Sequence, residues 1–110
     1  MMASTQCGCA SAQQSSPVSF TAETDRVYLD TTADCVIDDA DQKRRITITK
    51  TGSQATVVWN PWAERDKAMP DMAAGGYQRM VCVETANTEP HPVTVAPGEQ
   101  HCMGFTLSVT

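Results

Sequence analysis

The sequence lacks several features that mark membrane and nucleic-acid-binding proteins. No apolar run approaches the ~20 residues that span a bilayer. The longest basic cluster is Lys43-Arg44-Arg45, in a chain with a net charge of -5. The first residues have neither the basic start nor the apolar stretch of a signal peptide. We therefore expect a cytoplasmic protein with no membrane and no nucleic-acid partner.

A second close pair of cysteines is also missing. Cys7-Gly8-Cys9 supplies two of the four ligands that a structural zinc site needs, and no other pair completes the set. We expect no metal and no cofactor. The five cysteines form an odd set without an export signal, which favours reduced thiols. Cys82 and Cys102 lie in apolar, strand-like runs, so we predict that both are buried and free of disulfides.

The two histidines form no recognisable catalytic pattern. His91 and His101 lie beside prolines and polar residues in or near loops, and neither has an acidic or serine partner at a typical spacing. The sequence therefore indicates no catalytic triad.

What is present indicates one all-β domain. A chain of 110 residues, 41% hydrophobic, is long enough for one core. Residues 1–17 are rich in Ser, Gln, Ala and Gly and are expected to be a flexible tail. Residues 18–110 are expected to form an antiparallel β-sandwich of about seven or eight strands. The predicted strands are 18–20, 26–29, 35–38, 44–50, 55–59, 77–84, 93–96 and 102–109.

Turn signals connect these strands. The alternation in residues 45–49 indicates a half-buried strand, and residues 51–54 form a short turn into residues 55–59, so we predict a hairpin. Pro97-Gly98 predicts another turn, from residues 93–95 into the last strand. One helical turn is predicted, over residues 62–69, between Pro61 and Pro70.

The most informative stretch for chemistry runs from residue 77 to residue 87. On a strand, Met80, Cys82 and Glu84 share one face, so Glu84 continues an apolar row. Partial desolvation there favours the neutral carboxyl group and raises its pKa toward the range of a general base. Alternatively, Glu84 lies just past the end of the strand, in solvent.

Three further residues are candidates for binding a substrate. Asp25 lies beside Arg26 at the start of a strand and can accept hydrogen bonds from sugar hydroxyls, or it is an ordinary turn acid. Trp59 and Trp62 place two indoles around the turn that contains Asn60. These indoles form either a wall on which a sugar stacks or ordinary packing contacts.

Five stretches together resemble one family. They are residues 20–28, 57–62, 71–72, 77–87 and 95–99, and they include Asp25-Arg26-Val27-Tyr28 and Val81-Cys82-Val83-Glu84-Thr85-Ala86. Their order and spacing are similar to those of the glucose-6-phosphate 1-epimerases, the hexose-6-phosphate mutarotase branch of the aldose 1-epimerase group. The family fold is a large antiparallel supersandwich of the galactose mutarotase type, and these motifs all resemble its carboxyl-terminal part.

The resemblance implies roles for single residues. Glu84 matches the glutamate that removes the proton of the anomeric hydroxyl, and Asp25 matches the aspartate that binds the sugar. In the family a histidine from an earlier strand protonates the ring oxygen, and arginines from an earlier portion hold the phosphate. Neither His91 nor His101 lies in a motif that replaces that acid.

Two functions follow from this resemblance. The first is a stand-alone, partial mutarotase-like domain with a remnant site for hexose 6-phosphate or another carbohydrate, not catalytic alone. The alternative is an active isomerase, an aldose or hexose-6-phosphate 1-epimerase whose acid and phosphate clamp come from another chain. In either case, an uncovered sheet edge or apolar face predicts a homo-oligomer, in particular a two-fold dimer.

Overall fold

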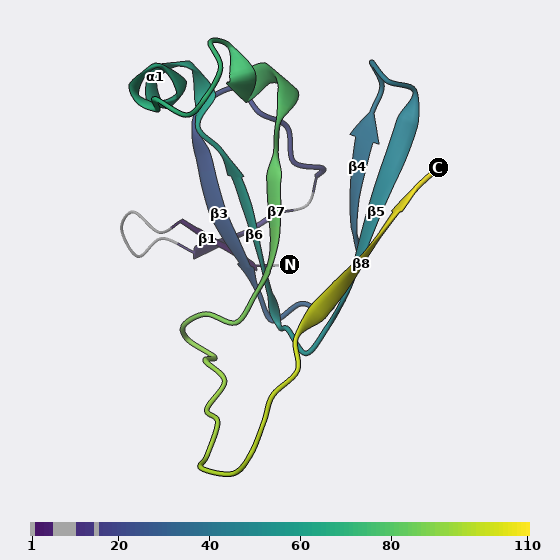
Figure 1. Ribbon diagram of the computed structural model, residues 1–110, viewed down its shortest axis with the longest axis vertical. Coiled ribbons are helices and arrows are strands. Elements are labelled where there is room, and N and C mark those ends of the chain that lie inside the picture. Colours follow the sequence, from purple (N-terminus) through teal and green to yellow (C-terminus); the bar gives the residue numbers. More distant parts are fainter. Residues whose placement is uncertain (1, 6–10, 15) are drawn as a thin grey trace.

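Two antiparallel sheets form the protein in the computed structural model, which describes residues 2–5, 11–14 and 16–110. The five-stranded sheet has the order β2-β1-β3-β6-β7 and the three-stranded sheet has the order β4-β5-β8. The sheets lie face to face and diverge from one end, where they are connected (Figure 1). The strands are β1 (Met2–Thr5), β2 (Ser11–Gln13), β3 (Thr24–Leu29), β4 (Cys35–Asp39), β5 (Arg44–Thr51), β6 (Ala55–Asn60), β7 (Cys82–Ala86) and β8 (Gly104–Val109). The predicted all-β antiparallel sandwich is confirmed.

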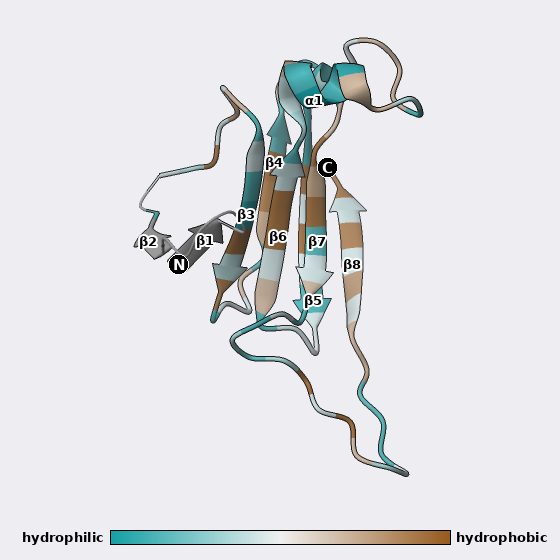
Figure 2. Ribbon diagram, turned by 90° about the vertical axis from the view of Figure 1, so that its left-hand side faces the viewer, coloured by the Kyte–Doolittle hydropathy of each residue, from teal (hydrophilic) through white to brown (hydrophobic). Residues whose placement is uncertain are grey.

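Strand β6 lies between β3 and β7 in the five-stranded sheet. It carries Ala55, Val57 and Val58, which are at most 8% exposed. A strand that is buried on both faces is a continuous apolar run rather than an alternating one, and the segment Ala-Thr-Val-Val-Trp has that character. Figure 2 shows this run of apolar residues along β6. The main buried cluster, which consists of Val27, Ala55 and Val57, lies on the face of this sheet that points away from the three-stranded sheet.

The helical turn is confirmed as α1 (Trp62–Ala68). It begins after the buried Pro61 and ends at Met69, before Pro70. A short 3-10 helix, η1 (Gly76–Arg79), follows it and precedes β7. Trp62 and Tyr77 pack against each other with ring centroids 5.1 Å apart. Both helices therefore lie at one end of the five-stranded sheet, next to the start of β7 (Figure 1).

The predicted hairpin between residues 45–49 and 55–59 is wrong, because β5 and β6 belong to different sheets. The turn between them leads the chain from the three-stranded sheet into the five-stranded sheet. Lys50 Nζ donates to the Ala55 carbonyl at 2.8 Å and to Thr56 Oγ1 at 2.9 Å, and Ser53 Oγ lies 2.6 Å from the Ala86 carbonyl oxygen. These partly buried contacts connect the end of one sheet to the start of the other. Gly52 has a positive φ of 69°, and a Cβ there would collide with the Cys102 carbonyl oxygen.

Three predicted strands differ from the structure. Residues 18–20 form no strand, and Val18 and Phe20 line the cavity between the sheets. Residues 93–96 form none either, because Pro92 and Pro97 lack N–H donors and the connection 87–103 extends away from both sheets (Figure 1). The Pro97-Gly98 turn itself is confirmed by a bond from Glu99 N to the Ala96 carbonyl. The strand predicted over 77–84 begins at Cys82, since residues 76–79 are η1.

The amino-terminal segment contains two short strands. β1 pairs antiparallel with β3 and with β2, and so extends the five-stranded sheet. The mobility that the sequence predicts for residues 1–17 stays a prediction. Cys7 and Cys9 lie outside the described residues.

Candidate functional site

The register of three strands brings the two candidate carboxylates to one face. Asp25, Trp59 and Cys82 lie directly opposite one another across β3, β6 and β7. Val27, Val57 and Glu84 form the next row. Residues that are opposite each other in a ladder share a face of the sheet, so all six side chains are on one side. We call these six residues the Asp25–Glu84 face.

Asp25 and Glu84 stand at opposite corners of this face. They are separated by two strand spacings across the sheet and by two residues along it, which places their Cα atoms about 12 Å apart. Trp59, which is partly exposed, and Val57, which is buried, lie on the strand between them. Two carboxylates beside an aromatic side chain can bind a ring that carries hydroxyl groups, because a carboxylate accepts hydrogen bonds and an aromatic ring packs on an apolar sugar face.

Glu84 differs in part from both sequence interpretations. It lies in the middle of β7 rather than past its end, so the position given by the second interpretation is wrong. Its side chain is exposed, as the second interpretation expects, and the apolar row does not enclose it. Burial raises the pKa of the neighbouring Cys82 thiol, and the negative charge of Glu84 raises it further. Cys82 is therefore a protonated, half-buried thiol beside the candidate base.

Arg65 belongs to this site although the sequence did not single it out. Its guanidinium carbon lies 5.9 Å from the centroid of a Trp59 ring, and its Nη1 donates to Glu23 Oε1 at 2.9 Å. A cation over an indole covers part of the ring on which a sugar could stack. The available signal was the charged helical turn at 62–69, which follows directly on the strand that carries Trp59.

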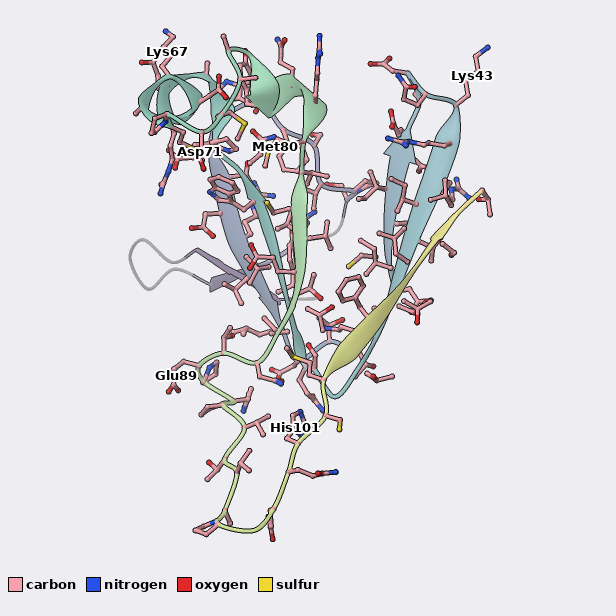
Figure 3. All side chains as sticks on the ribbon, in the orientation of Figure 1. Lys43, Lys67, Asp71, Met80, Glu89 and His101 are labelled. Carbon is pink, nitrogen blue, oxygen red and sulfur yellow. The ribbon has the colours of Figure 1, made fainter. Side chains whose placement is uncertain are left out.

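Asn60 lies on the opposite side of the sheet from the Asp25–Glu84 face. It pairs with Thr24 at the strand ends and is 2% exposed. Its Nδ2 donates to the carbonyls of Tyr77 and Met80, each at 2.9 Å, and its Oδ1 accepts from Trp62 N at 2.9 Å. Met80, which lies between η1 and β7, is labelled in Figure 3. The amide thus holds the chain that leads into β7. Its role in binding a substrate stays a prediction.

The histidines are occupied elsewhere. His91 Nε2 lies 3.0 Å from Asp30 Oδ1, and His101 Nε2 lies 2.7 Å from the Gly52 carbonyl. Asp30 follows the end of β3, five residues from Asp25, which is about 16 Å along a strand. His101 is labelled at the base of the 87–103 connection in Figure 3. In the described part of the chain, neither histidine makes a hydrogen bond or ion pair with a residue of the Asp25–Glu84 face.

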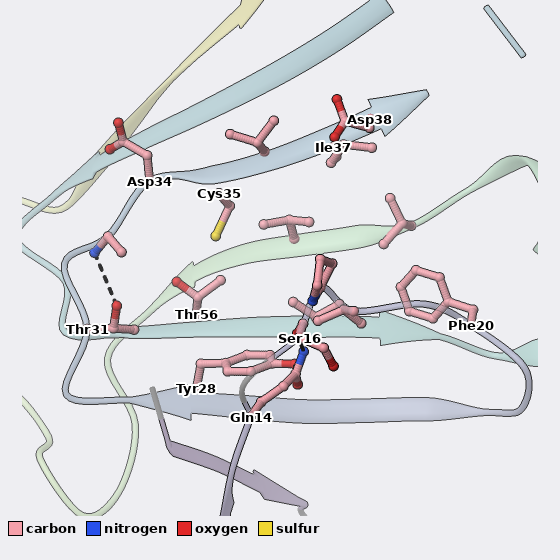
Figure 4. A pocket seen from close by; sticks show the side chains of 17 residues that line it. Gln14, Ser16, Phe20, Tyr28, Thr31, Asp34, Cys35, Ile37, Asp38 and Thr56 are labelled. Atoms are coloured by element: carbon pink, nitrogen blue, oxygen red, sulfur yellow. Dashed lines mark hydrogen bonds between the residues drawn. The ribbon is translucent and has the colours of Figure 1, made fainter. Parts of the chain in front are cut away.

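A separate cavity of about 560 Å³ lies between the two sheets (Figure 4). Its walls are mainly apolar, and Tyr28, Val58 and Val83 of the five-stranded sheet face Cys35 and Ile37 of β4. One end is polar, where Gln14 Oε1 accepts from both Tyr28 Oη and Arg26 Nη1. The alternation of side chains in a strand puts this cavity on the other side of the five-stranded sheet from Asp25 and Glu84.

The cysteine prediction is wrong for one residue. Cys35, Cys82 and Cys102 are free thiols, but Cys102 is exposed and Cys82 is only half-buried. Cys102 precedes β8 and belongs to the connection that extends away from the sheets. This position explains its exposure.

Among the residues that the structure describes, no group of three His, Cys, Asp or Glu side chains is arranged to hold a metal ion. In the same residues, neither helix has the length and apolarity needed to cross a bilayer.

The chain is similar in sequence to known proteins. Residues 5–108 match the aldose 1-epimerase family. A protein of Cenchrus ciliaris named "putative glucose-6-phosphate 1-epimerase" is 40% identical over 88 residues, 80% of this chain and 26% of that protein. Proteins of the same name from Salmonella typhimurium and Escherichia coli are 42% and 40% identical, over 60% and 61% of this chain and 22% and 23% of theirs.

The chain spans about a quarter of the length of these curated relatives. No solved structure gives a significant match. Since the family match extends over almost all of the sequence, the chain belongs to the aldose 1-epimerase family.

Proposed function

We propose that the Asp25–Glu84 face is part of a sugar site, with Glu84 as general base. Asp25 accepts hydrogen bonds from sugar hydroxyls, and Trp59 provides an aromatic platform. The observation that carries this proposal is the strand register, which gathers these three side chains on one face. The exposure of Glu84 leaves its carboxylate accessible to a ligand.

The substrate class that we propose is a hexose 6-phosphate. The curated relatives are named for glucose 6-phosphate. In 1-epimerisation, a base takes the proton of the anomeric hydroxyl, the bond between the anomeric carbon and the ring oxygen breaks, and the ring oxygen gains a proton. Rotation about the first carbon–carbon bond and reclosure then give the other anomer. Glu84 would be the proton acceptor of the first step.

We propose further that these residues alone bind the sugar without appreciable catalysis. Ring opening needs a proton donor at the ring oxygen, and each such proton transfer typically contributes about 10²–10⁴-fold. His91 and His101 are paired with Asp30 and the Gly52 carbonyl, away from Glu84. Without an acid and a clamp on the phosphate, a carboxylate also lacks the positioning that makes it effective.

A second candidate is an active epimerase completed by another polypeptide. The observation that favours it is the quarter-length match to the relatives, which leaves most of their residues without a counterpart here. In this case the acid and the phosphate clamp come from the partner, and Glu84 stays the base. We also propose that the chain itself forms a homo-oligomer, because β8 exposes Phe105, Leu107 and Val109.

Binding and catalysis need separate measurements. Glucose 6-phosphate should change the tryptophan fluorescence of the wild-type protein, and Asp25→Ala should weaken this response at least about tenfold. Polarimetry on freshly dissolved α-glucose 6-phosphate should show the uncatalysed rate for wild type and Glu84→Gln alike. Glu89→Gln is the matched control, because Glu89 is an exposed acid on the 87–103 connection and is not one of the six residues of the face (Figure 3).

The results distinguish the candidates. Acceleration that depends on Glu84 but not on Glu89 would reject the non-catalytic proposal and favour a complete epimerase site. Absence of binding in the wild type would reject the sugar site itself.

A further inference from the structure

Strand β8 differs from the other strand edges of the molecule. Of the described edge strands, β4 carries Asp38 and Asp39, β7 carries Glu84, and β2 has three residues. β8 has six residues, Gly-Phe-Thr-Leu-Ser-Val, and none is charged. Natural sheets protect exposed edges with charges, prolines, bulges or short strands. β8 has none of these protections, and Figure 2 shows it at the margin of the molecule.

The backbone of β8 has an unpaired side. Arg45 and Thr110 exchange both backbone hydrogen bonds, at 2.8 and 2.9 Å. Because such pairs alternate along an antiparallel ladder, the groups of Ser108 and Thr106 also point to β5. The N–H and C=O groups of Phe105, Leu107 and Val109 therefore point outward, away from β5.

The side chains of the same three residues are also uncovered. Phe105 is 65% exposed, Leu107 is 53% exposed and Val109 is 54% exposed. They share the face of Ile46 and Ile48, the side of the sheet that faces the cavity. An apolar stripe and a row of outward backbone groups thus coincide on one strand.

We infer that β8 is the interface through which two copies of this chain pair, antiparallel, about a two-fold axis at Leu107. In this register Leu107 faces Leu107 of the second copy, and Phe105 faces Val109. Each of these pairs can exchange both backbone hydrogen bonds, because these are the residues whose groups point outward. The apolar side chains then meet across the axis, and the two three-stranded sheets become one continuous sheet.

Charge favours β8 over the other strand edges as the place where a second copy binds. Each copy carries a net charge of -5, so association is opposed wherever acidic residues meet. Antiparallel pairing through β4, centred on Ile37, would place Asp38 and Asp39 of each copy in the interface, and pairing through β7, centred on Glu84, would set the two Glu84 carboxylates opposite each other. The uncharged β8 avoids this repulsion. A six-residue edge is a small interface, so we expect a dissociation constant of about 1–100 µM.

The decisive experiment is sedimentation of the full chain with two matched variants. Leu107→Lys puts two ammonium groups directly opposite each other at the axis and should weaken dimerisation at least about tenfold. Val36→Lys makes the same change of charge at a residue that is 52% exposed on β4, the opposite edge of the same sheet. It should leave the dimer unchanged. Circular dichroism checks that both variants fold.

Amide exchange gives a second, independent readout on the wild type. At high concentration the amides of Phe105, Leu107 and Val109 should be protected, and dilution below the dissociation constant should release them. The amides of Thr106 and Ser108 should stay protected throughout, since β5 holds them. This alternation would persist even if Leu107→Lys failed to fold.

This inference rests on the homo-oligomer proposed above, and the outcomes separate the two. A wild type that is monomeric at several hundred micromolar would reject both. A dimer that survives Leu107→Lys with fast exchange at Phe105, Leu107 and Val109 would keep the oligomer and reject the β8 interface. Loss of the dimer in Val36→Lys alone would assign the interface to β4 instead.

Discussion

The five-stranded and three-stranded sheets are built from similar types of residue, but their side chains are buried to very different extents. Both contain β-branched and apolar residues with the spacing of strands. In the five-stranded sheet, Val27, Val57 and Val58 are between 4% and 8% exposed. In the three-stranded sheet, Leu107 and Val109 have the same apolar character and are more than half exposed. Residue type and periodicity therefore determine which side chains share a face, but not whether that face is covered.

Different interactions hold the two sheets at their ends. In the five-stranded sheet, a buried amide, Asn60, and a pair of packed rings join β6 to the helices and to β7. The three-stranded sheet ends in two ion pairs, Arg44–Asp39 and Arg45–Asp38, both at 2.8 Å and both exposed to solvent. Exposed ion pairs typically contribute about 0–1 kcal/mol. The stability of the molecule should therefore depend mainly on the five-stranded sheet.

The largest expected effect comes from comparing the buried amide at the end of one sheet with an exposed ion pair at the end of the other. Asn60→Ala removes three hydrogen bonds of a buried amide and leaves the carbonyls of Tyr77 and Met80 without their donor. We expect a loss of about 3 kcal/mol in the free energy of unfolding. Asp38→Ala, at the exposed ion pair, should cost less than about 1 kcal/mol. Urea denaturation followed by circular dichroism measures both, and equal losses would contradict the comparison.

A second pair of variants tests whether the burial of an apolar side chain determines how much it contributes to stability. Val57→Ala truncates a residue that is 7% exposed and should cost about 2 kcal/mol, because it removes buried methyl groups and leaves a cavity. Leu107→Ala removes more apolar volume from a residue that is 53% exposed, yet below the dimer's dissociation constant it should cost less than about 1 kcal/mol. The reverse order in urea denaturation would show that the three-stranded sheet holds the main core.

Sequence reasoning succeeded where a local pattern determines the outcome. The alternation around Ile46 and Ile48 and the proline-bounded turn at 62–69 gave β5 and α1 almost at their observed limits. The sequence put Glu84 at the end of one predicted strand and Asp25 just before another; in the structure both residues lie within strands and share a face.

The failures come from contacts between segments that are distant in sequence. A short turn between two strands predicts a hairpin, but β5 and β6 find their partners in β8 and β7, which follow much later in the chain. Likewise, Asn60 looked like a residue of an exposed turn, because its acceptors at Tyr77 and Met80 lie 17 and 20 residues away. The Arg65 contact with Trp59 depends on how α1 folds back over the sheet, which no spacing in the sequence determines.

Lys50 connects the two sheets and gives a smaller effect. Lys50→Met removes the bonds to the Ala55 carbonyl and Thr56 Oγ1 and should cost about 1 kcal/mol near neutral pH. Lys43→Met, at an exposed lysine, is the control and should cost almost nothing. Urea denaturation compares them, and an unaffected Lys50→Met would show that the sheets do not depend on this crossing.

The pH dependence of Lys50 has a definite sign. Burial lowers the pKa of Lys50 from 10.5, and the neighbouring Cys35 opposes this in part. Between the lowered pKa and 10.5 the unfolded chain binds more protons than the folded chain, so wild-type stability should gain with rising pH in that window. Lys50→Met should lose this gain, whereas Lys43→Met should keep it.

The smallest effect concerns one thiol and tests the proposed site directly. Burial raises the pKa of Cys82, and the charge of Glu84 raises it further, so Glu84→Gln should lower that pKa while burial still keeps it above its ordinary value of 9.0. Alkylation by iodoacetamide requires the thiolate. At a fixed pH below that value, labelling of Cys82 should therefore be faster in Glu84→Gln than in the wild type. Peptide-resolved mass spectrometry across a pH series separates Cys82 from the other thiols. Cys35, on the three-stranded sheet, should label at an unchanged rate, and Glu89→Gln should reproduce the wild-type profile of Cys82. If the Cys82 profile stays the same in Glu84→Gln, then Glu84 does not lie beside Cys82 on this face, and the arrangement proposed for the sugar site is wrong.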